Sequence, residues 1–153
     1  MIREEEAGFM ETWDESAEGV VVLPDGRRLR GRALRAKAPA DGQRPEFGIY
    51  LGARRHEEVW ELRWIRWADF RLPRSTFEAV AVLGEAYERA AFSRVEIACG
   101  GGSGRTGTAI AILARYSGVP AEEAVEWVRA NYRRRAIETP GQRHFASRTN
   151  LVR

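Results

Sequence analysis

The stretch VEIACGGGSGRTG, residues 95–107, decides the fold. A mainly apolar run over residues 94–99 predicts a short buried strand that ends at Cys99. Four glycines and a serine follow, and a helix is expected from about residue 105 to residue 117, where Gly118 ends it. The first N–H groups of a helix have no internal partners, and glycines let the backbone curl so that such groups converge. This order of elements therefore predicts an anion-binding site.

Cys99 and Arg105 stand at the two ends of this loop, six positions apart. A guanidinium group can hold two phosphate oxygens at once, and a cysteine thiolate is a strong nucleophile. The positive field of the loop and of Arg105 favours the thiolate, and Thr106 is expected to donate a hydroxyl hydrogen bond to Cys99. The loop residues expected to bind the anion are Gly100, Gly101, Gly102, Ser103, Gly104 and Arg105.

The pattern of Cys99, five residues, Arg105, Thr106 and Gly107 resembles the signature loop of the protein tyrosine and dual-specificity phosphatases. The resemblance extends from about residue 47 onward. It implies hydrolysis of phosphotyrosine through a cysteinyl-phosphate intermediate, with neither a metal nor a cofactor. Phosphoserine and phosphothreonine stay open as further substrates. The implied partner is a phosphorylated protein or a small phosphomonoester.

Trp67-Ala68-Asp69 is similar to the segment of this family that carries the general acid, often as Trp-Pro-Asp. The resemblance implies that Asp69 protonates the leaving oxygen and then deprotonates the attacking water. Ala68 stands where the family has proline, which bears on how rigid this segment is. The alternative for Asp69 is a turn or cap residue at the end of a strand.

Residues 138–145 are similar to the glutamine loop of the tyrosine phosphatases, which positions the hydrolytic water. Either Glu138 or Gln142 could serve that role, and a plain helix-capping turn with Phe145 in the core is the alternative. Ala98 replaces the histidine that the family usually has before the cysteine. This departure motivates a second candidate function, a catalytically weak module that binds phosphate.

Four alternative interpretations explain the loop less well: a dinucleotide site, a P-loop, a sulfurtransferase loop and a purely structural cysteine. Residues 102–107 match G-x-G-x-x-G, but a dinucleotide site needs a following strand, and residues 121–135 predict a helix. A P-loop needs lysine at the position of Arg105. A sulfurtransferase loop is generally one residue shorter. A small buried residue at a strand end is the plain alternative for Cys99.

The remaining patterns predict one α/β domain over residues 1–153, with a central mixed sheet of four to five strands and helices on both faces. Expected strands cover residues 19–23, 27–35, 47–51 and 59–67, the last of them buried on both sides. A helix is expected after Ser75, its N-cap, with further helices from Pro120 and over residues 140–150. Residues 1–18 are acidic and are expected to be a loosely ordered lead-in.

Composition restricts the function classes. The net charge is +3, and no apolar run is long enough to span a membrane. The single cysteine excludes an internal disulfide and favours a cytoplasmic location. Two histidines and one cysteine offer no metal-ligand cluster. Arginine runs at residues 27–35 and 133–135 are interpreted as solvated surface, with no nucleic-acid motif. The uncharged residues 100–104 predict a substrate with one phosphate group, and the oligomeric state stays open.

Overall fold

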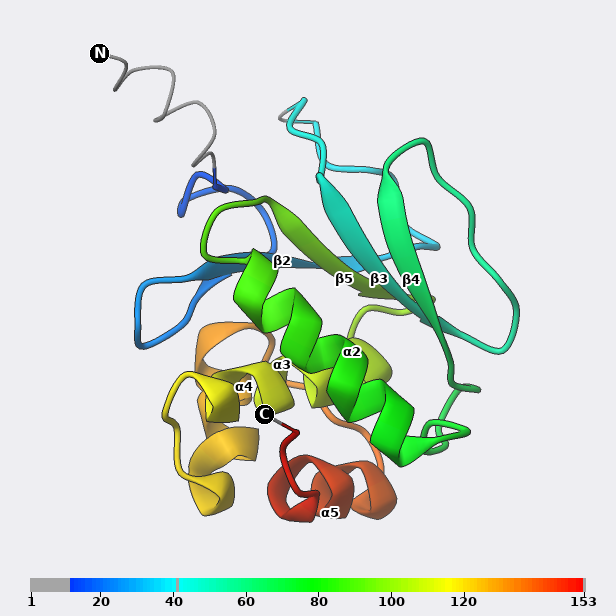
Figure 1. Cartoon of the computed structure of the whole chain (residues 1–153), viewed down its shortest axis with the longest axis vertical. Coiled ribbons are helices and arrows are strands. Elements are labelled where there is room, and N and C mark those ends of the chain that lie inside the picture. Colours follow the sequence, from blue (N-terminus) through cyan, green and yellow to red (C-terminus); the bar gives the residue numbers. More distant parts are fainter. Residues whose placement is uncertain (1–11, 41, 153) are drawn as a thin grey trace.

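Five strands form one mixed sheet in the order β1-β2-β5-β3-β4 in the computed structural model, which describes residues 12–40 and 42–152 (Figure 1). Strand β1 pairs with β2 in antiparallel fashion, whereas the other neighbouring pairs are parallel. The strands are β1 (Val20–Val22), β2 (Arg28–Ala33), β3 (Phe47–Gly52), β4 (Glu61–Arg66) and β5 (Val95–Cys99). The predicted α/β class and mixed sheet are confirmed.

Parallel pairing brings the carboxyl ends of the central strands to one edge of the sheet. Ala33, the last residue of β2, is the register partner of Cys99, the last residue of β5. The pairing continues past the strands, because the N–H of Leu34 donates to the carbonyl of Cys99 at 2.8 Å. Ligand sites of open α/β sheets lie outside this edge, and the predicted loop begins there.

Four α-helices of the described ranges pack together below the sheet in the view of Figure 1. They are α2 (Thr76–Arg89), α3 (Gly104–Tyr116), α4 (Ala124–Asn131) and α5 (Pro140–Arg148), and a 3₁₀ turn, η1 (Ala121–Glu123), precedes α4. Helix α3 lies at the centre, and residues 104–114 are all buried. Because α3 directly follows the central strand β5, the loop between them lies where the sheet and the helices meet.

Within the described part of the chain, the helices cover one face of the sheet. Val95, Ile97 and Cys99 point to that face and join the apolar core. The opposite face carries Glu96, which is 2% exposed and which accepts hydrogen bonds from Arg32 Nε at 2.9 Å and from Tyr50 at 2.7 Å. Burial raises the pKa of Tyr50, so its hydroxyl stays a donor. The segment after β3 covers this face, because His56 packs against Tyr50 and the Trp60 indole N–H donates to the Tyr50 hydroxyl at 2.7 Å. The expected second layer of helices is therefore not observed among the described residues.

The N-terminal segment, residues 1–18, was expected to be loosely ordered, and this expectation is wrong for Trp13. Residues 1–11 lie outside the described residues, but Trp13 is fully buried. Its indole N–H donates to the carbonyl of Val95 at 2.8 Å, and the guanidinium of Arg30 lies 4.4 Å from a Trp13 ring centroid. The interpretation of the first arginine run as solvated is therefore wrong for Arg30, which is 1% exposed, and for Arg32.

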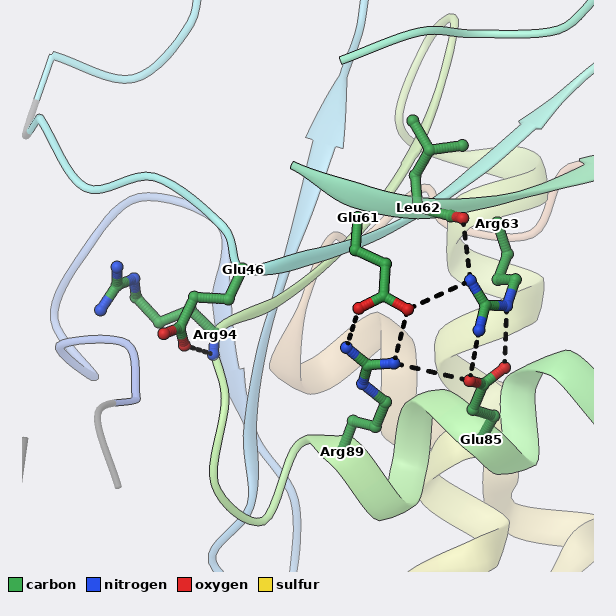
Figure 2. Close-up of polar contacts among 7 residues, drawn as sticks. All are labelled: Glu46, Glu61, Leu62, Arg63, Glu85, Arg89 and Arg94. Carbon is green, nitrogen blue, oxygen red and sulfur yellow. Dashed lines mark hydrogen bonds and ion pairs between the residues drawn. The ribbon is translucent and has the colours of Figure 1, made fainter. Parts of the chain in front are cut away.

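Strand β4 is shorter than predicted and lies at the edge of the sheet, and Ile65 is the one buried residue among its six, so the expected burial of both faces is wrong. Figure 2 shows how it is fastened to α2. Glu61 accepts from Arg89 Nη2 at 2.6 Å, and Arg63 Nη2 lies 2.8 Å from Glu85. The hydrogen bond from Arg89 lowers the pKa of Glu61. These ion pairs hold the edge strand on α2, and charged side chains on an edge strand discourage pairing with another chain.

No helix in the described ranges is both long enough and apolar enough to cross a membrane.

Candidate active site

The loop from Cys99 to Gly104 turns the chain from β5 into α3, as predicted. The Cys99 side chain is buried at its base, and the N–H of Gly102 donates to Sγ at 3.2 Å. Gly102 has φ of 75°, a backbone region that other residues rarely adopt, and a Cβ there would lie 2.9 Å from the Ala33 nitrogen. A glycine at this position therefore permits the curl that places an N–H over the thiol.

The carbonyl groups of residues 99–103 all accept hydrogen bonds from residues outside the loop. The N–H groups of Leu34, Arg35 and Gly107 donate to the carbonyls of residues 99, 100 and 103 in turn. Arg133 donates to the carbonyl of residue 101, and Tyr132 donates to that of residue 102. No described hydrogen bond uses the N–H groups of residues 100, 101, 103 and 104. These N–H groups are free to meet an anion inside the curl.

Tyr132 and Arg133, which were not predicted as site residues, donate hydrogen bonds to carbonyl groups of the loop. The hydroxyl of Tyr132 donates to the Gly102 carbonyl at 2.6 Å. Burial raises the pKa of Tyr132, which keeps this hydroxyl protonated and able to donate. Arg133 Nη1 donates to the Gly101 carbonyl at 2.9 Å and to Ser103 Oγ at 3.1 Å. The prediction of solvated surface is therefore wrong for Arg133.

Arg105 is 6% exposed, and main-chain groups from two strand ends fix its guanidinium. Nη1 donates to the carbonyls of Leu51 at 3.2 Å and Trp67 at 3.1 Å. Nη2 lies 3.4 Å from Asp69 Oδ1, and Nε is buried with no partner among the described residues. An unpaired buried N–H is costly, so Nε is a natural donor for an anion in the loop.

Asp69 lies beside the loop because its neighbours are fixed. Trp67 is fully buried, its indole N–H donates to the carbonyl of Arg71 at 2.6 Å, and it packs edge-on against Phe145 at 6.0 Å. The next residue after Asp69, Phe70, has φ of 62°, which is strained for an aromatic residue. The Asp69 carboxylate is 43% exposed, so it can reach a ligand that enters from solvent.

Thr106 does not make the predicted bond to Cys99. Its hydroxyl is buried and has no hydrogen-bond partner among the described residues. The thiol instead accepts from the N–H of Gly102. The backbone thus supplies at Cys99 the donor that the sequence assigned to the Thr106 side chain.

The segment 138–142 both caps a helix and borders the loop. Thr139 is the N-cap of α5 and forms a capping box with Gln142, so the capping alternative is observed. Gln142 is fully buried, its Oε1 accepts from the N–H of Glu138 at 2.9 Å, and its Nε2 has no described partner. A Cβ at Gly104 would lie within 3.2 Å of Gln142 Oε1 and still closer to the Glu138 carboxylate. Both side chains therefore border the start of α3.

Arg35 was assigned to solvated surface, but it reaches the loop. Its guanidinium lies beside Gly100 and Gly101, where an added Cβ would meet Nη1 at 2.9 Å and Nη2 at 3.2 Å. No local pattern could have indicated this contact, because it depends on the pairing of β2 with β5.

Replacing Tyr132 by phenylalanine is expected to lower the free energy of unfolding by about 1 kcal/mol, the usual loss for one buried hydrogen bond. Because the lost bond fixes Gly102, binding of an anion such as vanadate should also weaken. Urea unfolding and vanadate titration measure the two effects. Tyr116→Phe is the matched control, because its hydroxyl donates to the Val152 carbonyl at 2.6 Å, outside the loop. If both variants bind vanadate equally well, Tyr132 does not shape the loop.

Known proteins resemble this chain in sequence and in fold. The family model described as protein-tyrosine phosphatase matches residues 39–149. No curated protein gives a significant match. The solved structure of Tk-PTP in its active form is 24% identical, with a TM-score of 0.63 over 82% of this chain and 92% of that one. Kinase associated phosphatase, solved with serine in place of its catalytic-site cysteine, is 16% identical, with a TM-score of 0.65 over 84% of this chain and 90% of that one.

Proposed function

The chain belongs to the protein-tyrosine phosphatase family, and on that premise we propose that it hydrolyses phosphotyrosine in proteins without a metal ion, through a phosphoryl group carried by Cys99. The observation that carries the proposal is the Cys99 thiol at the base of the loop, where it accepts from the N–H of Gly102, with the guanidinium of Arg105 fixed beside Gly100. Phosphoserine and phosphothreonine remain candidate substrates.

In the first step, Cys99 Sγ attacks phosphorus and the bond from phosphorus to the tyrosyl oxygen breaks. Asp69 gives its proton to that oxygen, so tyrosine leaves as the neutral phenol. In the second step, water attacks phosphorus and the S–P bond breaks. Asp69 takes the proton of the water, inorganic phosphate leaves, and Cys99 returns as a thiolate.

The loop stabilises the phosphoryl oxygens in both steps. The free N–H groups of residues 100, 101, 103 and 104 and the unpaired Nε of Arg105 are donors that are fixed before the substrate arrives. Donors held in place stabilise developing charge without reorganisation, which is the largest contribution in many enzymes. The contacts of Arg105 with Leu51 and Trp67 keep its guanidinium in this position.

Gln142 is the better candidate to position the attacking water. Its Nε2 is a buried donor with no described partner, whereas its Oε1, the atom nearest to Gly104, is occupied by the N–H groups of Glu138 and Thr139. Glu138 is exposed and carries negative charge, which opposes the approach of a phosphoryl group.

The candidate from another class is a module that binds phosphate without turnover, motivated by Ala98 and Ala68. Ala98 lies on the polar face of β5, beside Tyr50 in the sheet register, and has no side chain that could support the loop. Binding of phosphopeptide with no release of phosphate would favour the module.

Asp69→Asn is expected to slow turnover of phosphotyrosine by about 10²-fold or more, because asparagine cannot protonate the leaving oxygen. The loss should be smaller with p-nitrophenyl phosphate, whose leaving group departs without a proton. Steady-state kinetics on both substrates measures the difference. Equal losses on the two substrates would place the general acid elsewhere.

Purified wild-type protein assayed with a phosphotyrosyl peptide and a metal chelator tests the proposed function. Release of inorganic phosphate that vanadate inhibits is the expected result. A second assay, binding of the same peptide by fluorescence anisotropy, separates the alternatives. Binding without release would support the phosphate-binding module, and neither binding nor release would contradict both.

A further inference from the structure

We propose that Arg35 is a second anion-binding residue beside the phosphate loop and that the preferred substrate is a phosphopeptide with another anionic group next to its phosphorylated residue. That group is a carboxylate or a second phosphate. The inference rests on the proposed function, since it concerns the substrate of the same site.

The position of Arg35 follows from the sheet. The pairing of β2 with β5 continues beyond Cys99, and the Arg35 N–H donates to the Gly100 carbonyl at 3.1 Å. A Cβ at Gly100 would lie 2.9 Å from Arg35 Nη1 and 3.4 Å from Arg105 Nη2. The two guanidinium groups therefore approach the first residue of the loop together, although 70 positions separate them in the sequence.

The charge of Arg35 is not neutralised by the described part of the protein. Its side chain is exposed, and none of the described hydrogen bonds or ion pairs involves its guanidinium. The one described ion pair of Arg105 is with Asp69, at 3.4 Å. Two neighbouring cations repel each other, so a bound anion between or beside them is stabilised.

Further cations lie next to β2, the strand that precedes Arg35. Lys37 and Arg133 line a cavity of about 240 Å³ next to β2, in which Glu18 is the one acidic residue. The described partners of Arg133 are a carbonyl, a hydroxyl and the Tyr132 ring, none of them charged. An anionic group that extends from the loop toward β2 therefore meets net positive charge.

Arg35 recognises a group outside the transferred phosphoryl group. The phosphoryl oxygens have the loop N–H groups and Arg105 as donors, and residues 100–104 carry no charged side chain. Arg35 lies on the outer side of Gly100 and Gly101, where a side chain of those residues would be. The segment after β2 thus supplies a charge that the loop sequence lacks, and to the expected substrate with one phosphate group it adds a second anionic group.

Three phosphotyrosyl peptides test the proposal: one with alanine, one with glutamate and one with phosphoserine beside the phosphotyrosine. Wild-type protein should show about tenfold higher kcat/KM on the anionic peptides, mainly through KM, and the preference should decrease with salt. Arg35→Ala should bring the ratio of anionic to neutral peptide close to one. The glutamate and phosphoserine arms distinguish which group is preferred.

Arg35→Glu distinguishes loss of charge recognition from loss of structure. This variant should prefer a peptide with lysine beside the phosphotyrosine, whereas a misfolded variant would lose activity on every peptide. Arg148→Ala is the matched control, an exposed arginine at the end of α5 that should keep the wild-type ratio. A wild-type ratio near one, or a preference that survives in Arg35→Ala, would overturn the inference. Turnover of p-nitrophenyl phosphate by the wild type tests the proposed function separately.

Discussion

Cys99→Ser is expected to abolish turnover, with kcat lower by at least about 10⁴-fold on every substrate. A serine hydroxyl is not ionised at neutral pH, so the nucleophile is lost, whereas its size suits the buried position at the base of the loop. Binding should survive, because the loop N–H groups and Arg105 do not depend on the sulfur.

Two measurements on Cys99→Ser distinguish loss of chemistry from loss of structure. The thermal unfolding midpoint should stay close to that of the wild type, and phosphotyrosyl peptide should still bind in an anisotropy titration. Phosphate release by the serine variant at a rate near the wild type would show that another residue is the nucleophile.

Arg105→Lys is the second change with a large expected effect, a decrease in kcat/KM of about 10²- to 10³-fold. The guanidinium contacts Leu51, Trp67 and Asp69 at once, and lysine cannot reproduce this planar geometry. The change would therefore release the segment that carries the general acid as well as weaken the phosphate contacts.

Arg115→Lys is a matched control on the same helix. Its Nη1 donates to the Ala146 carbonyl at 3.0 Å, away from the loop, and burial lowers its pKa. Steady-state kinetics on both variants should show the large loss only at position 105. Comparable losses would mean that the Arg105 effect is one of general stability.

The local part of the site could be predicted from the sequence because it is encoded in adjacent residues. The strand, the glycine-rich loop and the helix over residues 95–116 appear where the pattern placed them. Ser75 caps α2 as predicted, since its side chain accepts from the N–H of Glu78. Such features depend on neighbours a few positions apart, so composition and periodicity indicate them.

The parts that were missed depend on contacts between distant segments. Arg35, Tyr132 and Arg133 reach the loop only because β2 and the end of α4 lie beside it. Arginine in a charged run is usually solvated, but Arg30 stacks on Trp13 and Arg32 pairs with the buried Glu96. No pattern in a single sequence identifies these partners, because each depends on the order of the strands in the sheet.

The most direct test of the central claim is to trap the phosphoryl group on Cys99. Asp69→Asn mixed with p-nitrophenyl phosphate should accumulate it, because the leaving group departs without an acid while the attacking water lacks its base. After an acid quench, peptide mass spectrometry is predicted to find one added phosphoryl group on the peptide that contains Cys99, and none in the double variant with Cys99→Ser. Turnover with no phosphoryl group on Cys99, or with one on another residue, would contradict the account.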